Sequence, residues 1–406
     1  MRQLLKIISF VFLFGFVFII PINNLASSEN MNPSPMKRFG HSMVYDAGNN
    51  RIILYGGETI RNNEYTQLSD TWIFDCTTNT WSQQNHTIHP IGRHNFGMVY
   101  DSNQQNVLLF GGFNNTHTLN DTWIYDCTTN SWSQKHSDIS PPSRSDPAMY
   151  YVPGFEKIIL FGGYSFEKAE PFSDTWVFDF STNIWMELYP QIAPSSRYGH
   201  RMVYDSFNQT GILFGGRAGE VTNDLWRYNY ELNFWKEIDL GEGEKPETRY
   251  WHDMVFDSEN QNVIIFGGRK SESIFTTIFN DVWIYEPEVN EWEEVNSETA
   301  PTSRCSSCSA YDSFKKNLVL FGGVSQIPMT ESTILNDTWI FNCENYSWKK
   351  IPLSNPSSSM ISSSIPSNGS GSSFSTRNAS SSGFSILIIV FLLPLSLVKL
   401  RKRPRK

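Results

Sequence analysis

The strongest constraint on this chain is a phrase of roughly 50 residues that occurs six times in succession. In each copy an apolar run ends in a double glycine, and a variable stretch then leads to an Asp and two tryptophans nine positions apart. The double glycines recur every 51–55 residues, at Gly56-Gly57, Gly111-Gly112, Gly162-Gly163, Gly215-Gly216, Gly267-Gly268 and Gly322-Gly323. The Trp pairs, which use twelve of thirteen tryptophans, are Trp72/Trp81, Trp123/Trp132, Trp176/Trp185, Trp226/Trp235, Trp283/Trp292 and Trp339/Trp348. Such a period, with room for four short strands per unit, indicates propeller blades.

An Arg opens the first strand of each copy: Arg38, Arg93, Arg144, Arg197, Arg249 and Arg304. Together with the double glycine, the Asp-x-Trp and the later Trp, these residues resemble the Kelch repeat over residues 36–351, about three quarters of the chain. The resemblance implies an all-β, six-bladed propeller with four antiparallel strands, a to d, per blade. It places the blades at residues 36–86, 91–137, 142–190, 195–240, 247–296 and 302–351. Each copy is complete, so we expect the ring to close by packing of the first blade on the last, unless residues before Met36 add a strand.

The N-terminal end of the chain indicates export. Arg2 and Lys6 precede an unbroken apolar run from Ile7 to Ile20, and Ala26-Ser27-Ser28 fits a small-residue cleavage pattern. Residues 1–28 are therefore predicted to be a secretory signal peptide, with an uncleaved anchor as the alternative.

The C-terminal end predicts attachment to a membrane. Residues 352–383 are rich in Ser and indicate a disordered stalk, and residues 384–400 are apolar and just long enough for a transmembrane helix. Residues 401–406 form a basic tail that should stay in the cytoplasm. The same arrangement resembles the sorting signals cut by sortase-like transpeptidases, in which case the helix is temporary. Either version places a single-pass or surface-attached propeller outside the cell.

The charge of the body argues against nucleic-acid binding. The two ends hold eight of the 32 basic residues and no acidic ones, so 24 basic residues face 41 acidic ones in the middle, a net charge of about −17. A domain this acidic repels phosphate backbones. Eight glycosylation sequons are compatible with an exported glycoprotein, at Asn85, Asn114, Asn120, Asn208, Asn336, Asn345, Asn368 and Asn378.

Loop lengths indicate where a ligand binds. The a–b and c–d turns are short and nearly identical in all copies, whereas the b–c and d–a loops vary in length and composition. Four antiparallel strands place both variable kinds on one face, and variable loops on a rigid frame are where binding usually resides. We therefore expect ligands at the b–c/d–a face and at the mouth of the central channel.

Two sets of residues are candidates for that site. The six arginines and the six aspartates before the strand c tryptophans form either an anion-binding ring or structural ion pairs, and the equal numbers favour structure. Residues that break the repeat are better candidates, because the scaffold does not explain them; Trp251 is the single tryptophan outside the pattern. A mixed aromatic and cationic pocket suited to a sugar ring or an acidic peptide is expected, with surface decoration as the alternative. The candidates are Glu58, Tyr164, Tyr198, Arg217, Arg249, Tyr250, Trp251 and Arg269.

The sequence gives no motif for catalysis, metal or a cofactor. There is no nucleophile elbow, phosphate-binding glycine loop or His-Glu-x-x-His. The five cysteines are expected to be free thiols with at most one bridge, and Cys305-x-x-Cys308 is placed in strand a. The leading hypothesis is a non-catalytic module that binds a protein or glycan at the cell surface. The alternatives are an exported sugar enzyme similar to a mutarotase or galactose oxidase, and a structural component of a surface layer.

Overall fold

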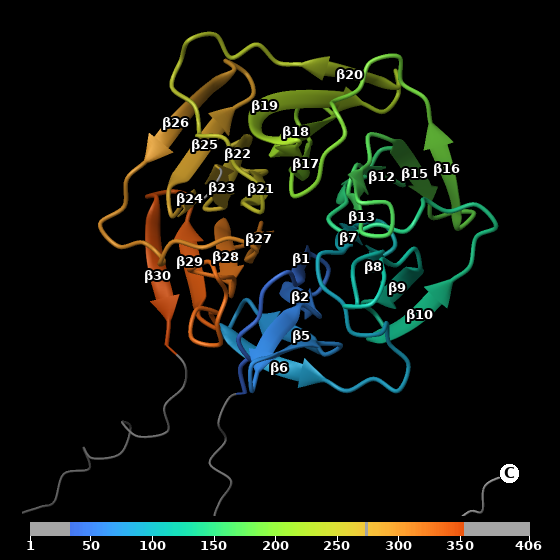
Figure 1. Ribbon diagram of the computed structural model, residues 1–406, viewed down its shortest axis with the longest axis vertical. Coiled ribbons are helices and arrows are strands. Elements are labelled where there is room, and N and C mark those ends of the chain that lie inside the picture. Colours follow the sequence, from blue (N-terminus) through green and yellow to red (C-terminus); the bar gives the residue numbers. More distant parts are fainter. Residues whose placement is uncertain (1–32, 273–274, 353–406) are drawn as a thin grey trace, which may run out of the picture. The chain divides into compact units, whose positions relative to one another are not determined.

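The described residues, 33–272 and 275–352, form a ring of six four-stranded antiparallel sheets in the computed structural model (Figure 1). Each sheet comes from one continuous stretch of chain, and its strand order follows the order of the chain. The first strand of each sheet lies at the central channel and the fourth at the rim. This confirms the predicted six-bladed, all-β propeller. The expected signal peptide, membrane helix and basic tail, and the stalk after Pro352, lie outside the described residues.

The strands of the first three blades are mostly five residues long. Blade 1 contains β1 (Ser42–Asp46), β2 (Arg51–Tyr55), β5 (Thr71–Asp75) and β6 (Thr80–Gln84). Blade 2 contains β7 (Gly97–Asp101), β8 (Asn106–Phe110), β9 (Thr122–Asp126) and β10 (Ser131–Lys135). Blade 3 contains β11 (Ala148–Val152), β12 (Lys157–Phe161), β15 (Thr175–Asp179) and β16 (Ile184–Leu188).

The other three blades follow the same plan. Blade 4 contains β17 (Arg201–Asp205), β18 (Thr210–Ala218), β19 (Glu220–Asn229) and β20 (Phe234–Glu237). Blade 5 contains β21 (Asp253–Asp257), β22 (Asn262–Phe266), β25 (Val282–Glu286) and β26 (Glu291–Val295). Blade 6 contains β27 (Cys308–Asp312), β28 (Asn317–Phe321), β29 (Thr338–Asn342) and β30 (Ser347–Ile351).

The first strand begins four residues after the Arg in every blade, so the prediction that the Arg opens the strand was wrong. The reason lies two residues after the Arg, where the backbone takes a positive φ, for example 55° at both Asn95 and Trp251. An extended strand cannot run through that conformation. Cys305 likewise precedes β27, which begins at Cys308, and all five cysteines are unpaired.

Aromatic side chains pack each blade on the one before it. Trp185 of β16 is fully buried between Phe178 of its own blade and Phe110 of blade 2, with ring centroids 5.1 and 5.0 Å away. The second strands are apolar on both faces because they lie between neighbouring sheets. The double glycine permits a close approach: a Cβ on Gly162, where φ is 66°, would lie 2.7 Å from the carbonyl oxygen of Arg197 in the next blade.

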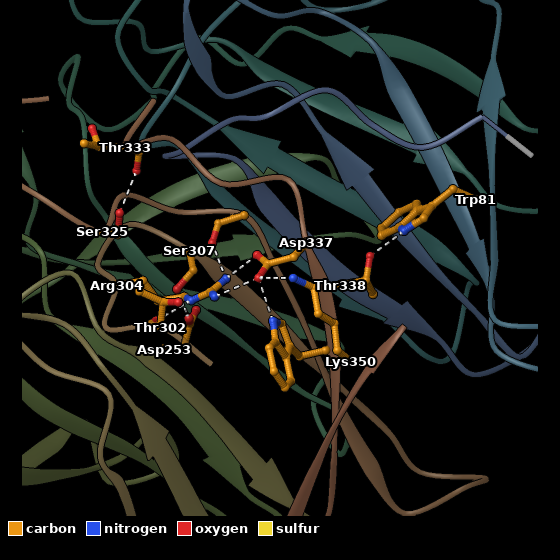
Figure 2. Close-up of polar contacts among 12 residues, drawn as sticks. Trp81, Asp253, Thr302, Arg304, Ser307, Ser325, Thr333, Asp337, Thr338 and Lys350 are labelled. Atoms are coloured by element: carbon orange, nitrogen blue, oxygen red, sulfur yellow. Dashed lines mark hydrogen bonds and ion pairs between the residues drawn. The ribbon is translucent and has the colours of Figure 1, made fainter. Parts of the chain in front are cut away.

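The ring closes by packing of blade 1 on blade 6, as expected. Residues 33–41 contain no strand. The indole N–H of Trp81 donates to Thr338 Oγ1 at 3.0 Å across this junction (Figure 2), and the N–H of Gly40 donates to the carbonyl of Ser306 at 2.9 Å. Within the described ranges, no helix is long and apolar enough to cross a membrane.

The two faces of the ring differ as predicted. The a–b and c–d turns make one face, and the b–c and d–a loops make the other, which we call the variable face. Three b–c loops fold into separate two-stranded sheets on this face: β3 (Glu58–Arg61) with β4 (Glu64–Gln67), β13 (Tyr164–Ser165) with β14 (Glu170–Pro171), and β23 (Arg269–Glu272) with β24 (Phe275–Ile278). In blade 4 the long strands β18 and β19 extend the blade itself.

Candidate ligand site at the channel mouth

The six arginines are structural. Each guanidinium is buried and forms two parallel hydrogen bonds with the Asp that precedes the strand c Trp of its own blade, the first at 2.6–2.8 Å. It also donates to the first carbonyl of the double glycine, and the Asp accepts the indole N–H of the nearby Trp, as with Asp337 and Trp339. Figure 2 shows this arrangement at Arg304 and Asp337, with Lys350 beside the carboxylate. Arg249 belongs to this set and donates to Asp281, so its side chain is not open to a ligand.

These ion pairs also fix the charge of the aspartates. Burial by itself raises a carboxyl pKa, but at Asp70, Asp121, Asp224 and Asp337 the hydrogen bonds and the positive charge of the Arg outweigh it. The pKa values of these carboxyl groups therefore lie below their ordinary value, and the groups remain ionised partners of the arginines.

A second ring consists of the six residues that lie two positions after the repeat arginines; we call it the mouth ring. Its members all have positive φ. Backbone N–H groups donate to the carbonyl of the neighbouring blade at five junctions, for example from Asn95 to Gly40 at 2.7 Å and from Trp251 to Gly199 at 2.7 Å. The six members are Gly40, Asn95, Asp146, Gly199, Trp251 and Ser306.

A cavity of about 290 Å³ lies over the mouth ring on the variable face. A second, smaller cavity of about 120 Å³ lies in the channel, and Asn95 and Asp146 line both. All six blades contribute to the larger cavity through the residues Phe39, Glu58, His94, Asn95, Asp146, Tyr164, Phe166, Tyr198, Trp251, Arg269, Cys305, Ser306, Val324, Ile327 and Met329.

The structure brings five of the eight candidate residues together in this cavity: Glu58, Tyr164, Tyr198, Trp251 and Arg269. Tyr250 is almost completely buried and supports Arg269, whose guanidinium carbon lies 4.7 Å from the Tyr250 ring centroid. Arg217 lies 6.0 Å from the same ring and lines a different cavity with Glu220 and Lys270. Arg249 is held in its ion pair.

Trp251 and Arg269 form the cationic side of the cavity. The indole lies over Gly199, where a Cβ would come within 2.9 Å of it, and donates to Asp146 Oδ1 at 3.0 Å. The Arg269 guanidinium carbon stacks 4.2 Å from the Trp251 ring. No described residue forms an ion pair or hydrogen bond with the Arg269 side chain, and its buried Nε has no partner. A cation held on aromatic rings without a carboxylate remains available to an anionic ligand.

The cavity also contains ionisable groups whose charge depends on the pH. Burial raises the pKa of Glu58 to about 7, although Gln67 donates a hydrogen bond to its carboxylate. Burial also raises the pKa of Asp146 to about 6 and lowers that of His94 to about 4. His94 Nδ1 lies 3.8 Å from Glu58 Oε2. The net charge around Arg269 therefore changes within one or two pH units of neutrality.

The sequence did not point to Asp146 or to the apolar wall as parts of the site. That wall comes from blade 6, where Val324, Ile327 and Met329 pack with Phe39. Asp146 occupies the same repeat position as Trp251, so aligning the residues two places after each Arg would have found it. Loop lengths alone do not predict that the b–c loop of blade 6 contributes side chains to the cavity.

The described part of the chain contains no group of three or more His, Cys, Asp or Glu side chains placed to hold a metal ion. The cavity instead combines one unpaired cation, aromatic rings and an apolar wall. This combination suits the binding of an amphipathic ligand that presents an acidic group.

Comparisons with known proteins agree with this fold. Residues 158–370 match the Attractin/LZTR1 beta-propeller model, and residues 16–208 match the KLHDC2/KLHL20/DRC7 Kelch-repeats domain model. The first of these covers more than half of the chain. The protein is therefore a β-propeller of the interaction-module class, and it belongs to the Kelch-repeat β-propeller family.

The chain is also similar to individual proteins of several organisms. It is 24% identical to Mei4-dependent protein 6 of Schizosaccharomyces pombe over 338 residues, which are 75% of this chain and 47% of that protein. It is 26% identical over 274 residues to Kelch domain-containing protein 10 of Rattus norvegicus and of Homo sapiens, with 62% of this chain and 63% and 59% of those proteins covered. The chain thus spans less than two thirds of the length of these relatives. Membership of the family indicates a protein-binding module.

Proposed function

We propose that the protein is a non-catalytic binding module of the cell surface whose mouth cavity receives part of a partner protein or a glycan. The observation that carries this proposal is Arg269, a cation stacked on Trp251 inside a cavity and left without an acidic partner among the described residues. A structural Arg of this protein looks different, because each of the six repeat arginines is buried against an Asp.

The chemistry of the cavity favours an acidic protein segment over a neutral sugar. One face of the Trp251 ring is covered by Arg269, which leaves less aromatic surface for a sugar ring. The blade 6 side chains Ile327 and Met329 offer an apolar wall that accommodates an aliphatic or aromatic side chain. A segment with an acidic group beside an apolar residue could therefore pair with Arg269 and pack against Ile327 and Met329.

The proposal is tested by comparing the variants Arg269→Gln and Arg217→Gln. Both remove an Arg that follows a double glycine, but only Arg269 lines the mouth cavity. The full-length chain is screened against arrays of acidic peptides, their amide counterparts and glycans, and hits are measured by calorimetry. Arg269→Gln should weaken the best acidic hit by roughly tenfold or more, as for loss of a charge-assisted bond, whereas Arg217→Gln should change it little. Equal losses in both variants would contradict the proposal.

The surface location is supported by the sequence at the two ends. The apolar run after Arg2 and Lys6 and the apolar segment before the basic tail are the features on which it depends. Labelling intact cells with a membrane-impermeant reagent should modify the propeller, and a propeller protected until the cells are lysed would refute this location.

A sugar enzyme remains the second candidate. The pair Glu58 and His94 would have to supply acid and base chemistry in that case. Stoichiometric bound copper, or turnover of a free sugar that is lost in Glu58→Gln, would replace the binding proposal with this one.

A further inference from the structure

The fourth strand of every blade is an exposed sheet edge. Among the described residues each of these strands pairs only with the third strand of its own blade. Its outward backbone N–H and C=O groups offer a template for a strand of another chain, and proteins usually protect such edges with charged or polar side chains.

The edge of blade 3 lacks this protection. The Trp at the second position of each fourth strand packs inwards, so positions one, three and five share the opposite side. In β16 these are Ile184, Met186 and Leu188; Ile184 and Met186 are 51% and 55% exposed, and Leu188 is half-buried. The other fourth strands carry polar or charged residues at the third position, namely Ser82, Ser133, Lys236, Glu293 and Lys349.

We propose that β16 is a self-association edge at which two copies of this chain pair in antiparallel fashion about a two-fold axis at Met186. This register puts Met186 opposite Met186 and Ile184 opposite Leu188 of the second copy, so one side of the joined sheet is wholly apolar. On the other side Trp185 lies opposite Glu187 of the second copy, and no like charges meet. The two blades become one continuous sheet of eight strands.

Charge explains why this edge, and not another, is selected. The same axis in β26 would place Glu293 against Glu293, and in β30 it would place Lys349 against Lys349, which is unfavourable across a strand pair. The equivalent pairs in β6 and β10 are Ser82 and Ser133, which offer hydrogen bonds to water and little apolar surface. Only β16 joins apolar side chains without opposing charges.

The contact is small, which sets the expected strength. Tyr189 and Ile192, 76% and 52% exposed, extend the apolar surface beyond the strand. Even so, a single strand edge buries less than the roughly 1,200–2,000 Å² of a standard stable interface. We expect weak pairing in dilute solution and stronger pairing when copies are confined to one surface, where their effective concentration is high.

The variant Met186→Cys tests the pairing directly in full-length chain on the membranes of expressing cells. Residues opposite one another on antiparallel strands have Cα atoms roughly 4.5–5.5 Å apart, which fits a disulfide. Mild oxidation should link Met186→Cys into dimers, whereas the matched variants Ser133→Cys and Lys349→Cys should stay monomeric. The native thiols give little background, because four of the five are buried. Linking of all three variants to the same extent would overturn the proposal.

A charge at the axis supplies the second test. Met186→Lys should raise the dimer dissociation constant by roughly tenfold, measured by sedimentation of purified full-length protein over a range of concentrations. Thermal unfolding of Met186→Lys should match that of the wild type, because the side chain is exposed. A wild type that stays monomeric at every concentration and on membranes would also overturn the proposal.

Discussion

Two rings of six residues, only two positions apart along the chain, have opposite character. At the first position all six blades have Arg, and every Arg is buried with the same carboxylate and carbonyl partners. At the second position, the mouth ring, the backbone repeats as faithfully, but the side chains are Gly, Asn, Asp, Gly, Trp and Ser. A residue that is identical in all six repeats is thus one that each blade needs in order to fold. Positions where the backbone conformation is the same but the side chain differs are the ones available for binding a ligand.

The largest effect should come from the constant ring. Arg93→Met leaves the half-buried Asp121 without its cation and removes the bond to the carbonyl of Gly111. We expect the free energy of unfolding to fall by about 3–5 kcal/mol, the usual cost of removing one partner of a buried pair. Urea unfolding measures it. Arg217→Met, outside both rings, should stay within about 0.5 kcal/mol; similar losses in both variants would erase the distinction between the rings.

The two rings should also respond to pH in opposite directions. Asp121 has a folded pKa below its ordinary 3.8, because Arg93 outweighs burial. Its stabilising effect is present above the unfolded pKa and is lost as the pH falls through the folded value. Asp146 of the mouth ring has its pKa raised to about 6 by burial. The stability contributed by its protonated form is present below about 3.8 and is lost as the pH rises through about 6.

Matched variants check these signs. Asp146→Asn should gain stability relative to the wild type as the pH rises from about 4 to about 7, because the variant no longer has a carboxyl to ionise. Asp121→Asn should be destabilising at neutral pH, and its cost should shrink as the pH falls below about 4. Urea titrations at several pH values measure both. Parallel pH profiles for the two variants would show that the rings are electrostatically alike.

The smallest predicted effect concerns the residue directly before the strand c Trp, which differs between blades. The fourth-strand indoles of blades 1–4 donate to a Thr hydroxyl of the preceding blade, as Trp235 does to Thr175 at 3.2 Å. In blades 4 and 5 that Thr is replaced by Leu225 and Val282, and the buried N–H groups of Trp292 and Trp348 have no partner.

Adding or removing this hydroxyl should move stability by about 1 kcal/mol in opposite directions. Val282→Thr supplies an acceptor for Trp348 and should stabilise the protein, whereas Thr175→Val should destabilise it. Thermal unfolding compares the two with the wild type. If Val282→Thr is destabilising, then the missing hydrogen bond of the Trp348 indole does not lower the stability of the wild type.

The fold could be predicted because the same pattern of residues occurs in all six repeats. The period, the double glycine and the Trp pair each predict the same blade, and the structure differs only where the positive φ after the Arg delays the first strand. The candidate site was only partly predictable, because it forms between blades. Arg217 and Arg269 hold equivalent positions in the sequence, yet only Arg269 lines the mouth cavity, whereas Arg217 lines a different one.

The last described strand, β30, lies at the rim and runs towards the variable face, so the chain leaves the propeller at the outer edge of that face. Whatever follows β30 along the chain therefore starts on the same face of the ring as the mouth cavity.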